Sequence, residues 1–147
     1  MEVLKIKKLR ENAVIPKRGT GGSAGMDLYA CIDEEITLKP QNLVMIPTGI
    51  AIELPSENYM ANIYSRSGLG VKHGITLSNG VGVVDSDYRG EVCVGLCNVS
   101  NKDYTIKPQE RIAQLVIAPV SMMPVVEVEE ISQTLRGQGG FGSTGKK

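Results

Sequence analysis

Short apolar runs, broken at close intervals by turn residues, make up the hydrophobic pattern of this chain. Six runs rich in Val, Ile and Leu predict β-strands at residues 3–9, 43–54, 59–64, 91–99, 112–120 and 125–128. Prolines recur along the chain and leave no room for a long helix, so we expect only a short helical turn at residues 67–72. The pattern predicts an all-β domain, a jelly-roll-like β-sandwich or barrel.

The 147 residues suit one domain, and no repeat or linker divides them. We expect a β domain over residues 1–135 and a glycine-rich, flexible lid segment of the same domain over residues 136–147. With one phenylalanine and no tryptophan, the core must rely on aliphatic side chains. Such a core is thin, which leads to the hypothesis that contacts between subunits add to its stability.

Charge and hydropathy exclude several classes of partner. The chain has 16 basic and 16 acidic residues, so it lacks the basic excess that broad nucleic-acid or membrane-surface binding requires. No apolar stretch approaches about 18 residues, and the N-terminus lacks the basic-then-apolar order of a signal peptide. We therefore expect a cytoplasmic protein that binds neither nucleic acid nor membrane, although a small polyanion needs only a few donors.

Three cysteines, Cys31, Cys93 and Cys97, form an odd count at no metal-site spacing. Cys93 and Cys97 are four residues apart in an apolar run, so on a strand they would share one face. We interpret them as small core residues in a reducing cytoplasm. Because His73 is the one histidine, a metal cage made only of protein ligands is not expected.

Two apolar runs flank a polar turn at residues 82–92, which is typical of a β-hairpin. Asp85 and Asp87 in such a turn are commonly Asx-turn acceptors. A carboxylate fixed in a hairpin can also orient a water molecule. Tyr88, beside it, could pack against a sugar.

Three further segments place polar residues at or near strand ends. Arg66, Ser67 and Gly68 follow a predicted strand and form either a phosphate cradle or a solvent-exposed turn. Asp27 interrupts an apolar strand start, where it could cap a turn or bind the water shell of Mg²⁺. Gln114 lies among apolar strand residues and by itself is typical of a structural polar group.

The single phenylalanine, Phe141, stands in residues 136–145, half of which are glycine. A disordered tail is the plain interpretation of such a composition. An aromatic ring there can instead close over a flat ligand, while Arg136, Ser143, Thr144 and the glycine N–H groups offer donors to an anion. A nucleoside triphosphate would satisfy both.

Taken together and in this order, the five segments resemble the five motifs of the homotrimeric dUTPases (dUTP diphosphatases). The matching residues are 24–30, 66–70, 82–90, 111–116 and 136–145. The resemblance implies a jelly-roll homotrimer whose active sites are shared between subunits. It implies hydrolysis of dUTP to dUMP and diphosphate, which keeps uracil out of DNA and supplies dUMP for dTMP synthesis, with Mg²⁺ held mainly by the triphosphate. Ser65 departs from the proline that relatives often have before the arginine of the second motif.

By position, the resemblance implies that Asp85 orients and activates the attacking water. It implies that uracil is read by Asn79 and by the hairpin backbone around Val83, Val84 and Cys93, and that Tyr88 packs on the deoxyribose.

The remaining motif residues face the phosphates in this resemblance. Residues that would hold phosphates are Arg66, Ser67, Gly68 and Gln114, while Asp27 would act on the Mg²⁺ water shell. In the lid segment, Phe141 would stack on uracil, and the γ-phosphate would be held by Arg136, Ser143 and Thr144. Gly140 and Gly142 beside them would also bind substrate.

Three rival interpretations stay open at this point. A dCTP deaminase shares the fold but is expected to use a glutamate at the base pocket, where this chain offers Asp85 and Tyr88. A trimeric nucleotide-binding regulatory protein would keep the same pocket. A serine hydrolase built from Ser65, Ser67 and His73 would need the histidine to meet a serine.

Overall fold

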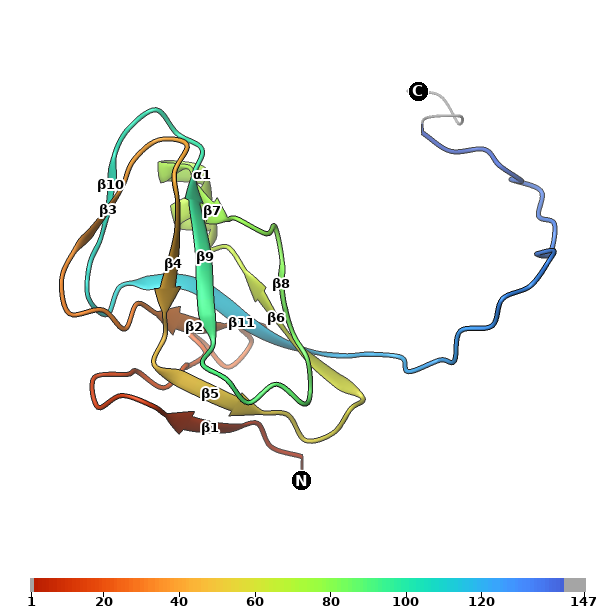
Figure 1. The fold of residues 1–147 in the computed structure, drawn as a ribbon, viewed down its shortest axis with the longest axis horizontal. Helices are drawn as coiled ribbons and strands as arrows, with labels where there is room; N and C mark the ends of the chain where they lie inside the picture. Colours follow the sequence, from red (N-terminus) through yellow and green to blue (C-terminus); the bar gives the residue numbers. More distant parts are fainter. Residues whose placement is uncertain (1, 142–147) are drawn as a thin grey trace.

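The computed structural model describes residues 2–141, which form an all-β fold with one short helix (Figure 1). The strands are β1 Lys5–Lys8, β2 Met26–Tyr29, β3 Ile36–Leu38, β4 Leu43–Pro47, β5 Ile50–Glu53, β6 Tyr59–Tyr64, β7 Ile75–Leu77, β8 Gly82–Val84, β9 Cys93–Asn98, β10 Tyr104–Ile106 and β11 Arg111–Pro119. Helix α1 spans Ser67–His73, close to the predicted turn. In the described part of the chain, no helix has the length and apolar character needed to cross a membrane.

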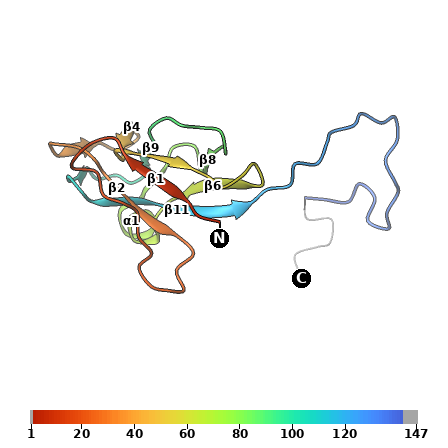
Figure 2. The ribbon, with the colours of Figure 1, turned by 90° about the horizontal axis from the view of Figure 1, so that it is seen from below.

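The strands pair antiparallel in four open sheets. A four-stranded sheet has the order β2-β11-β6-β8 and a three-stranded sheet the order β4-β9-β7, while β1 pairs with β5 and β10 with β3. Some paired strands, such as β2 and β11, are far apart in sequence. The view from below shows the sheets stacked in layers (Figure 2). The predicted β-sandwich is therefore confirmed, with sheets that do not close into a barrel.

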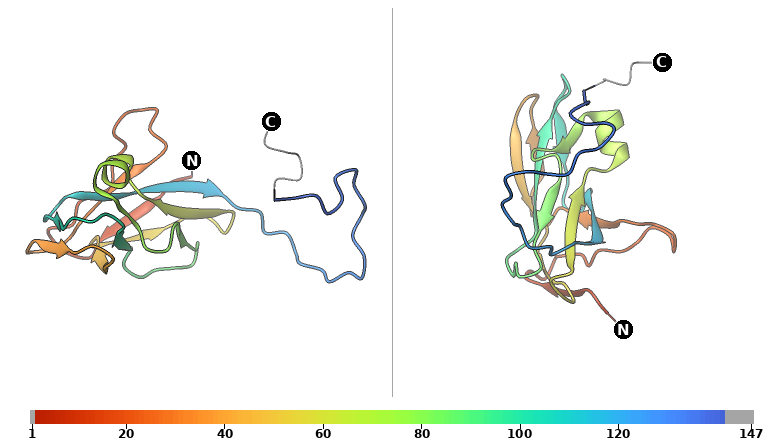
Figure 3. Two further views of the ribbon diagram at one scale, coloured as in Figure 1. Left: turned by 90° about the horizontal axis from the view of Figure 1, so that it is seen from above. Right: turned by 90° about the vertical axis from the view of Figure 1, so that its right-hand side faces the viewer.

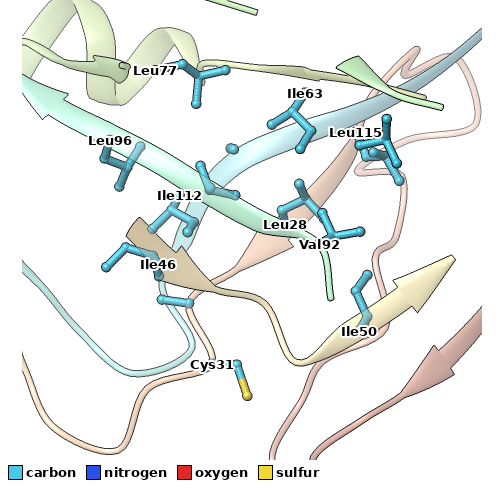
Figure 4. Close-up of a cluster of buried hydrophobic side chains, with 14 of the residues drawn as sticks. Leu28, Cys31, Ile46, Ile50, Ile63, Leu77, Val92, Leu96, Ile112 and Leu115 are labelled. Carbon is cyan, nitrogen blue, oxygen red and sulfur yellow. The ribbon is translucent and has the colours of Figure 1, made fainter. Parts of the chain in front are cut away.

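Aliphatic side chains from both main sheets meet between the layers. Figure 4 shows Ile46 and Leu96 of the three-stranded sheet beside Ile112 of the four-stranded sheet, with Leu28 and Leu115 of that sheet further along the same cluster. These five side chains are almost fully inaccessible to solvent. Burial of aliphatic area of this kind stabilises the fold in proportion to the area removed from water.

Cys93 and Cys97 share one face of β9, as their spacing predicts. That face is partly exposed, so the interpretation of both as core residues is wrong. Along β9, Val94, Leu96 and Asn98 are buried, whereas Cys93 and Cys97 alternate with them and stay partly exposed. Only Cys31 is a core cysteine. A period of two fixes which residues share a face, but the packing of the opposite sheet decides which face is buried.

The predicted strand at residues 43–54 is two strands, because the chain turns at Thr48 and Gly49. Gly49 has a φ of +69°, and a Cβ there would lie 2.6 Å from the Sγ of Cys31. Only glycine fits both the left-handed backbone and the space. The short strands β3, β7 and β10 were missed because three residues give too little periodicity to recognise.

The predicted hairpin at residues 82–92 is corrected in one respect. Its two legs do not pair with each other: β8 joins the edge of the four-stranded sheet beside β6, and β9 lies between β4 and β7. Residues 85–92 therefore bridge the two layers, and we call them the bridging loop. This arrangement opens a space between the legs that a paired hairpin would close.

Beyond β11 the chain leaves the body of the domain, and we call residues 120–141 the C-terminal arm (Figures 1 and 3). Val120 N–H donates to Asn58 O at 2.8 Å, and the hydrogen bonds recorded further along join arm residues to each other. The predicted strand at residues 125–128 is wrong. Val125 is 99% exposed, and no strand lies beside it in the described residues to pair with its backbone.

Candidate active site

A cavity of about 350 Å³ lies between β8 and the start of β9, the two strands that the bridging loop connects. It brings together six residues that the sequence singled out, Asn79, Val83, Val84, Asp85, Tyr88 and Cys93. They come from β8, the start of β9 and the segments beside them, and Met45 and Ile63 line the same cavity from more distant parts of the chain. Burial, followed by the nearby Glu91 carboxylate, raises the pKa of the Cys93 thiol, and Arg10 opposes this shift.

Hydrogen bonds within the bridging loop fix the shape of the segment that carries Asp85. The Tyr88 N–H donates to Asp85 O at 3.2 Å, and the Tyr88 hydroxyl donates to Glu91 O at 2.9 Å. A Cβ at Gly90 would lie 2.4 Å from the Tyr88 hydroxyl oxygen, so a larger residue there would have to displace the ring. The tyrosine is therefore held beside the carboxylate by the loop itself.

A second polar group forms around Asp27, at the meeting of β2, β6 and β11. Its Oδ1 accepts from Nε of Arg66 at 3.0 Å, and its Oδ2 accepts from Nη1 of Arg111 at 3.2 Å. Gln114 pairs in register with both Asp27 and Tyr64, which places these segments side by side. One carboxylate thus neutralises two guanidinium groups.

Gln114 lies in this second group with a structural bond of its own. Its Nε2 donates to Ser65 O at 3.0 Å, immediately before Arg66. Ser67 opens α1, and Gly68 has open space beside its Cα. Residues of the Asp27 group do not line the cavity that contains Asp85.

The C-terminal arm carries the third set of predicted residues away from both groups (Figure 3). Phe141 is fully exposed, and Arg136 donates from Nε to Gly139 O at 2.8 Å within the arm. Gly140 is half-buried. The predicted ligand residues Gly142, Ser143 and Thr144 lie outside the described residues.

The order and spacing of these groups are shared with a known family. The family model described as dUTPase matches residues 11–145. The chain belongs to the dUTPase family. Deoxyuridine 5'-triphosphate nucleotidohydrolases from Hydrogenobaculum sp. and Fusobacterium nucleatum are 51% and 50% identical to this dUTPase, over 98% and 99% of its chain and 99% and 100% of theirs.

Solved dUTPase structures also share the fold. A mutant of the phage 80alpha dUTPase matches with a TM-score of 0.86 at 30% identity, covering 96% of this dUTPase and 98% of that chain. Another mutant of that enzyme, solved with dUpNHpp, gives 0.84 at 29% identity over 97% and 98% of the two chains. A mutant dUTPase from phage phi11, whose structure concerns the coordination of a structural Mg(II) ion, matches with a TM-score of 0.78 at 27% identity. The match covers 87% of this dUTPase and 97% of that chain.

The relatives and the geometry bear on two of the rival interpretations, the dCTP deaminase and the serine hydrolase. The relatives are named for hydrolysis of dUTP, which favours that reaction over deamination of dCTP. His73 packs its ring against Tyr104, with centroids 5.1 Å apart. The Ser65 hydroxyl instead meets the Thr76 hydroxyl at 2.8 Å and accepts from Leu77 N–H at 3.1 Å, so the serine-hydrolase interpretation is wrong.

Sequence reasoning missed three residues in or beside the sites of this dUTPase. Glu91 and Met45 line the cavity, and Arg111 binds Asp27. Glu91 and Arg111 stand within or next to motif segments, so a charge count over those segments could have found them. Met45 gives no local signal, since the pairing of β4 with β9 brings it opposite Gly95.

Proposed function

We propose that this dUTPase hydrolyses dUTP to dUMP and diphosphate with a water molecule that Asp85 orients and activates. The observation that carries the proposal is the cavity, which Asp85, Asn79 and Tyr88 line together with β8. A carboxylate acting on water beside a held phosphate chain supplies general-base catalysis. Most of the remaining barrier reduction comes from positioning and charge neutralisation.

Uracil enters the space between β8 and the start of β9. In support, β8 is the edge strand of its sheet, and β7 pairs only with the far end of β9, beyond Cys93. Open strand edges present N–H and C=O groups, which match the acceptor–donor–acceptor edge of uracil, with the Asn79 amide beside them. Cytosine would leave buried groups mispaired at a cost of about 1–3 kcal/mol each. Tyr88 packs on the deoxyribose and leaves no room for a 2′-hydroxyl.

The phosphates are held by Arg66, Ser67, Gly68 and Gln114 of another subunit in a homotrimer. Two features support sharing of the site. The Asp27 group and the Asp85 cavity do not meet within one chain. The C-terminal arm also exposes a run of apolar side chains that a monomer would leave in water, Met122, Met123, Val125, Val126 and Val128.

Mg²⁺ is held mainly by the triphosphate, and when bound it neutralises phosphate charge. No group of three or more His, Cys, Asp or Glu residues within residues 2–141 could hold a metal ion. Mg²⁺ commonly keeps several waters and takes its other ligands from one or two carboxylates and substrate phosphates, so phosphate oxygens and waters can complete its coordination here. Both Asp27 oxygens accept from arginine, yet a carboxylate has about four lone-pair sites, so Asp27 can still accept from a water of the ion.

The arm supplies the lid in this proposal. Phe141 stacks on uracil, Arg136, Ser143 and Thr144 donate to the γ-phosphate, and Gly140 and Gly142 also bind substrate. The full exposure of Phe141 supports this role, because a core phenylalanine would not be placed there. The three free cysteines support a reducing, cytoplasmic location.

Diphosphate release from dUTP and the four common deoxynucleoside triphosphates, with and without Mg²⁺, tests the proposal. We expect release from dUTP alone and a strong requirement for Mg²⁺. Asp85→Asn should abolish turnover and spare dUMP binding, with sedimentation showing a trimer in both proteins. Turnover that persists in Asp85→Asn would show that another group activates the water.

A further inference from the structure

Glu91 lines the cavity, yet both oxygens of its carboxylate bind other parts of the protein. Its Oε1 accepts from Gly49 N–H at 2.8 Å, and its Oε2 accepts from Nη2 of Arg10 at 3.2 Å. The Glu91 side chain is only 23% exposed. Both oxygens therefore point to the β4–β5 turn and to the N-terminal segment, not to the space that holds substrate.

The two partners of Glu91 are themselves fixed. Gly49 packs closely against its surroundings, because a Cβ there would lie 2.6 Å from Cys31 Sγ and 2.7 Å from the Ala13 Cβ. Arg10 also donates from Nη1 to Cys31 O at 3.1 Å, so its guanidinium is held at two points. Glu91 is thus tied to a rigid part of the buried core.

The next residue strengthens the same junction. Val92 N–H donates to Ile50 O at 2.8 Å, and Val92 O accepts from the N–H and the hydroxyl of Thr48. The end of the bridging loop is therefore fastened to residues 48–50. The Tyr88 hydroxyl donates to Glu91 O, which connects this fastened end to the residues beside Asp85.

We propose that Glu91 is a positioning residue: with Arg10, it fixes the end of the bridging loop and so sets the place of Asp85 and Tyr88 over the cavity. Glu91 acts through the loop and not by contact with substrate. The inference rests on the proposed role of Asp85. A displacement of about 1 Å in a reacting group costs up to about a hundredfold in rate, so a loosened loop should lower turnover.

Arg10 provides the sharpest test, because it touches Glu91 but does not line the cavity. The full-length variants Arg10→Gln, Glu91→Ala and the double variant are compared for kcat, KM and dUMP binding. Lys5→Gln is the matched control: it also removes an N-terminal cation and an ion pair, with Glu53 at 2.6 Å, but Glu53 lies outside the bridging loop.

We expect Arg10→Gln and Glu91→Ala each to lower kcat about tenfold, with KM and dUMP affinity within about twofold of wild type. The double variant should be no worse than Glu91→Ala, because both changes release one junction. Lys5→Gln should keep the wild-type kcat. Amide hydrogen exchange should rise at residues 85–88 in Arg10→Gln and stay unchanged in Lys5→Gln.

Wild-type kcat in Arg10→Gln with only a lower melting temperature would overturn the positioning role. If Arg10→Gln does not fold, Arg10→Lys keeps the charge but replaces the two nitrogens that bind Cys31 O and Glu91 with one, and wild-type kcat there would overturn the positioning role equally. Asp85→Asn is measured in parallel to separate the two proposals. Turnover in Asp85→Asn counts against the proposed base, whereas its loss beside a wild-type kcat in Arg10→Gln counts against Glu91 alone.

Discussion

Arg66 donates from Nε to Oδ1 of Asp27 at 3.0 Å, so the proposed phosphate ligand and the residue proposed to face the Mg²⁺ water shell already form an ion pair. Arg111 binds the other oxygen of the same carboxylate. Asp27 therefore holds two cations in place before any phosphate arrives. Binding of a triphosphate would give the Arg66 guanidinium a second anion without requiring it to be ordered anew.

Loss of the arginine should weaken phosphate binding selectively. A charged hydrogen bond contributes about 1.5–3 kcal/mol, so Arg66→Ala should raise KM for dUTP about tenfold to a hundredfold. Deoxyuridine, which lacks phosphate, should bind as in wild type. Calorimetry with both ligands checks this, and a matching loss of deoxyuridine affinity would mean that Arg66 supports the base pocket instead.

Replacing the carboxylate should act on metal dependence. Asp27→Asn keeps the shape of the side chain but removes its charge and one acceptor. We expect the Mg²⁺ concentration for half-maximal diphosphate release to rise several-fold, while binding of deoxyuridine, which carries no phosphate, is unchanged. An unaltered Mg²⁺ titration would count against contact between Asp27 and the water shell of the ion.

Cys93 gives a chemical probe of the cavity. Burial raises the pKa of its thiol, so alkylation by iodoacetamide should be slow at neutral pH and faster as pH rises. Because Cys93 lines the cavity, dUMP should slow its labelling. Cys97 shares the same face of β9 but does not line the cavity, so it is the internal control. Mass spectrometry that finds equal protection of both thiols would place the nucleotide elsewhere.

The lid should close only on a triphosphate. Ordering the arm costs about 1–2 kcal/mol for each residue, whereas base stacking returns about 1–3 kcal/mol and each charged hydrogen bond about 1.5–3 kcal/mol. Stacking of Phe141 alone therefore cannot order the segment. Hydrogen exchange at residues 136–141 should slow with Mg²⁺ and dUpNHpp but not with dUMP. Equal protection in the two complexes would contradict this.

Tyr104 should make stability depend on alkaline pH. Burial, followed by its hydrogen bond to Glu110, raises the pKa of Tyr104 above the value of about 10 in an unfolded chain. The folded protein then holds the phenolic proton more tightly than the unfolded chain. This contribution is fully present below about pH 10 and is lost as pH rises toward the folded pKa.

Urea unfolding between pH 8 and pH 11 measures the effect. Tyr104→Phe should lower the free energy of unfolding at pH 8, because the Glu110 hydrogen bond is lost. Its stability should then fall less steeply than that of wild type above about pH 10. Parallel alkaline slopes for the two proteins would show that Tyr104 does not carry the dependence.

The sequence alone was enough for the fold class, the short helix and most of the longer strands. Local periodicity and turn residues carry that information, as the run at residues 59–64 shows, because they act between neighbours in the chain. The same local character explains the error at residues 125–128. Those residues have strand-forming side chains, but a strand also needs a partner for its backbone.

Which residues meet depends on how the sheets pair and stack. The pairing of β11 with both β2 and β6 brings Arg66 and Arg111 onto Asp27, and the separation of β8 from β9 opens the cavity beside Asp85. The tie between Glu91 and Gly49 is 42 residues long in sequence and was invisible to any pattern. Such contacts depend on the register and stacking of whole sheets, which no single segment specifies.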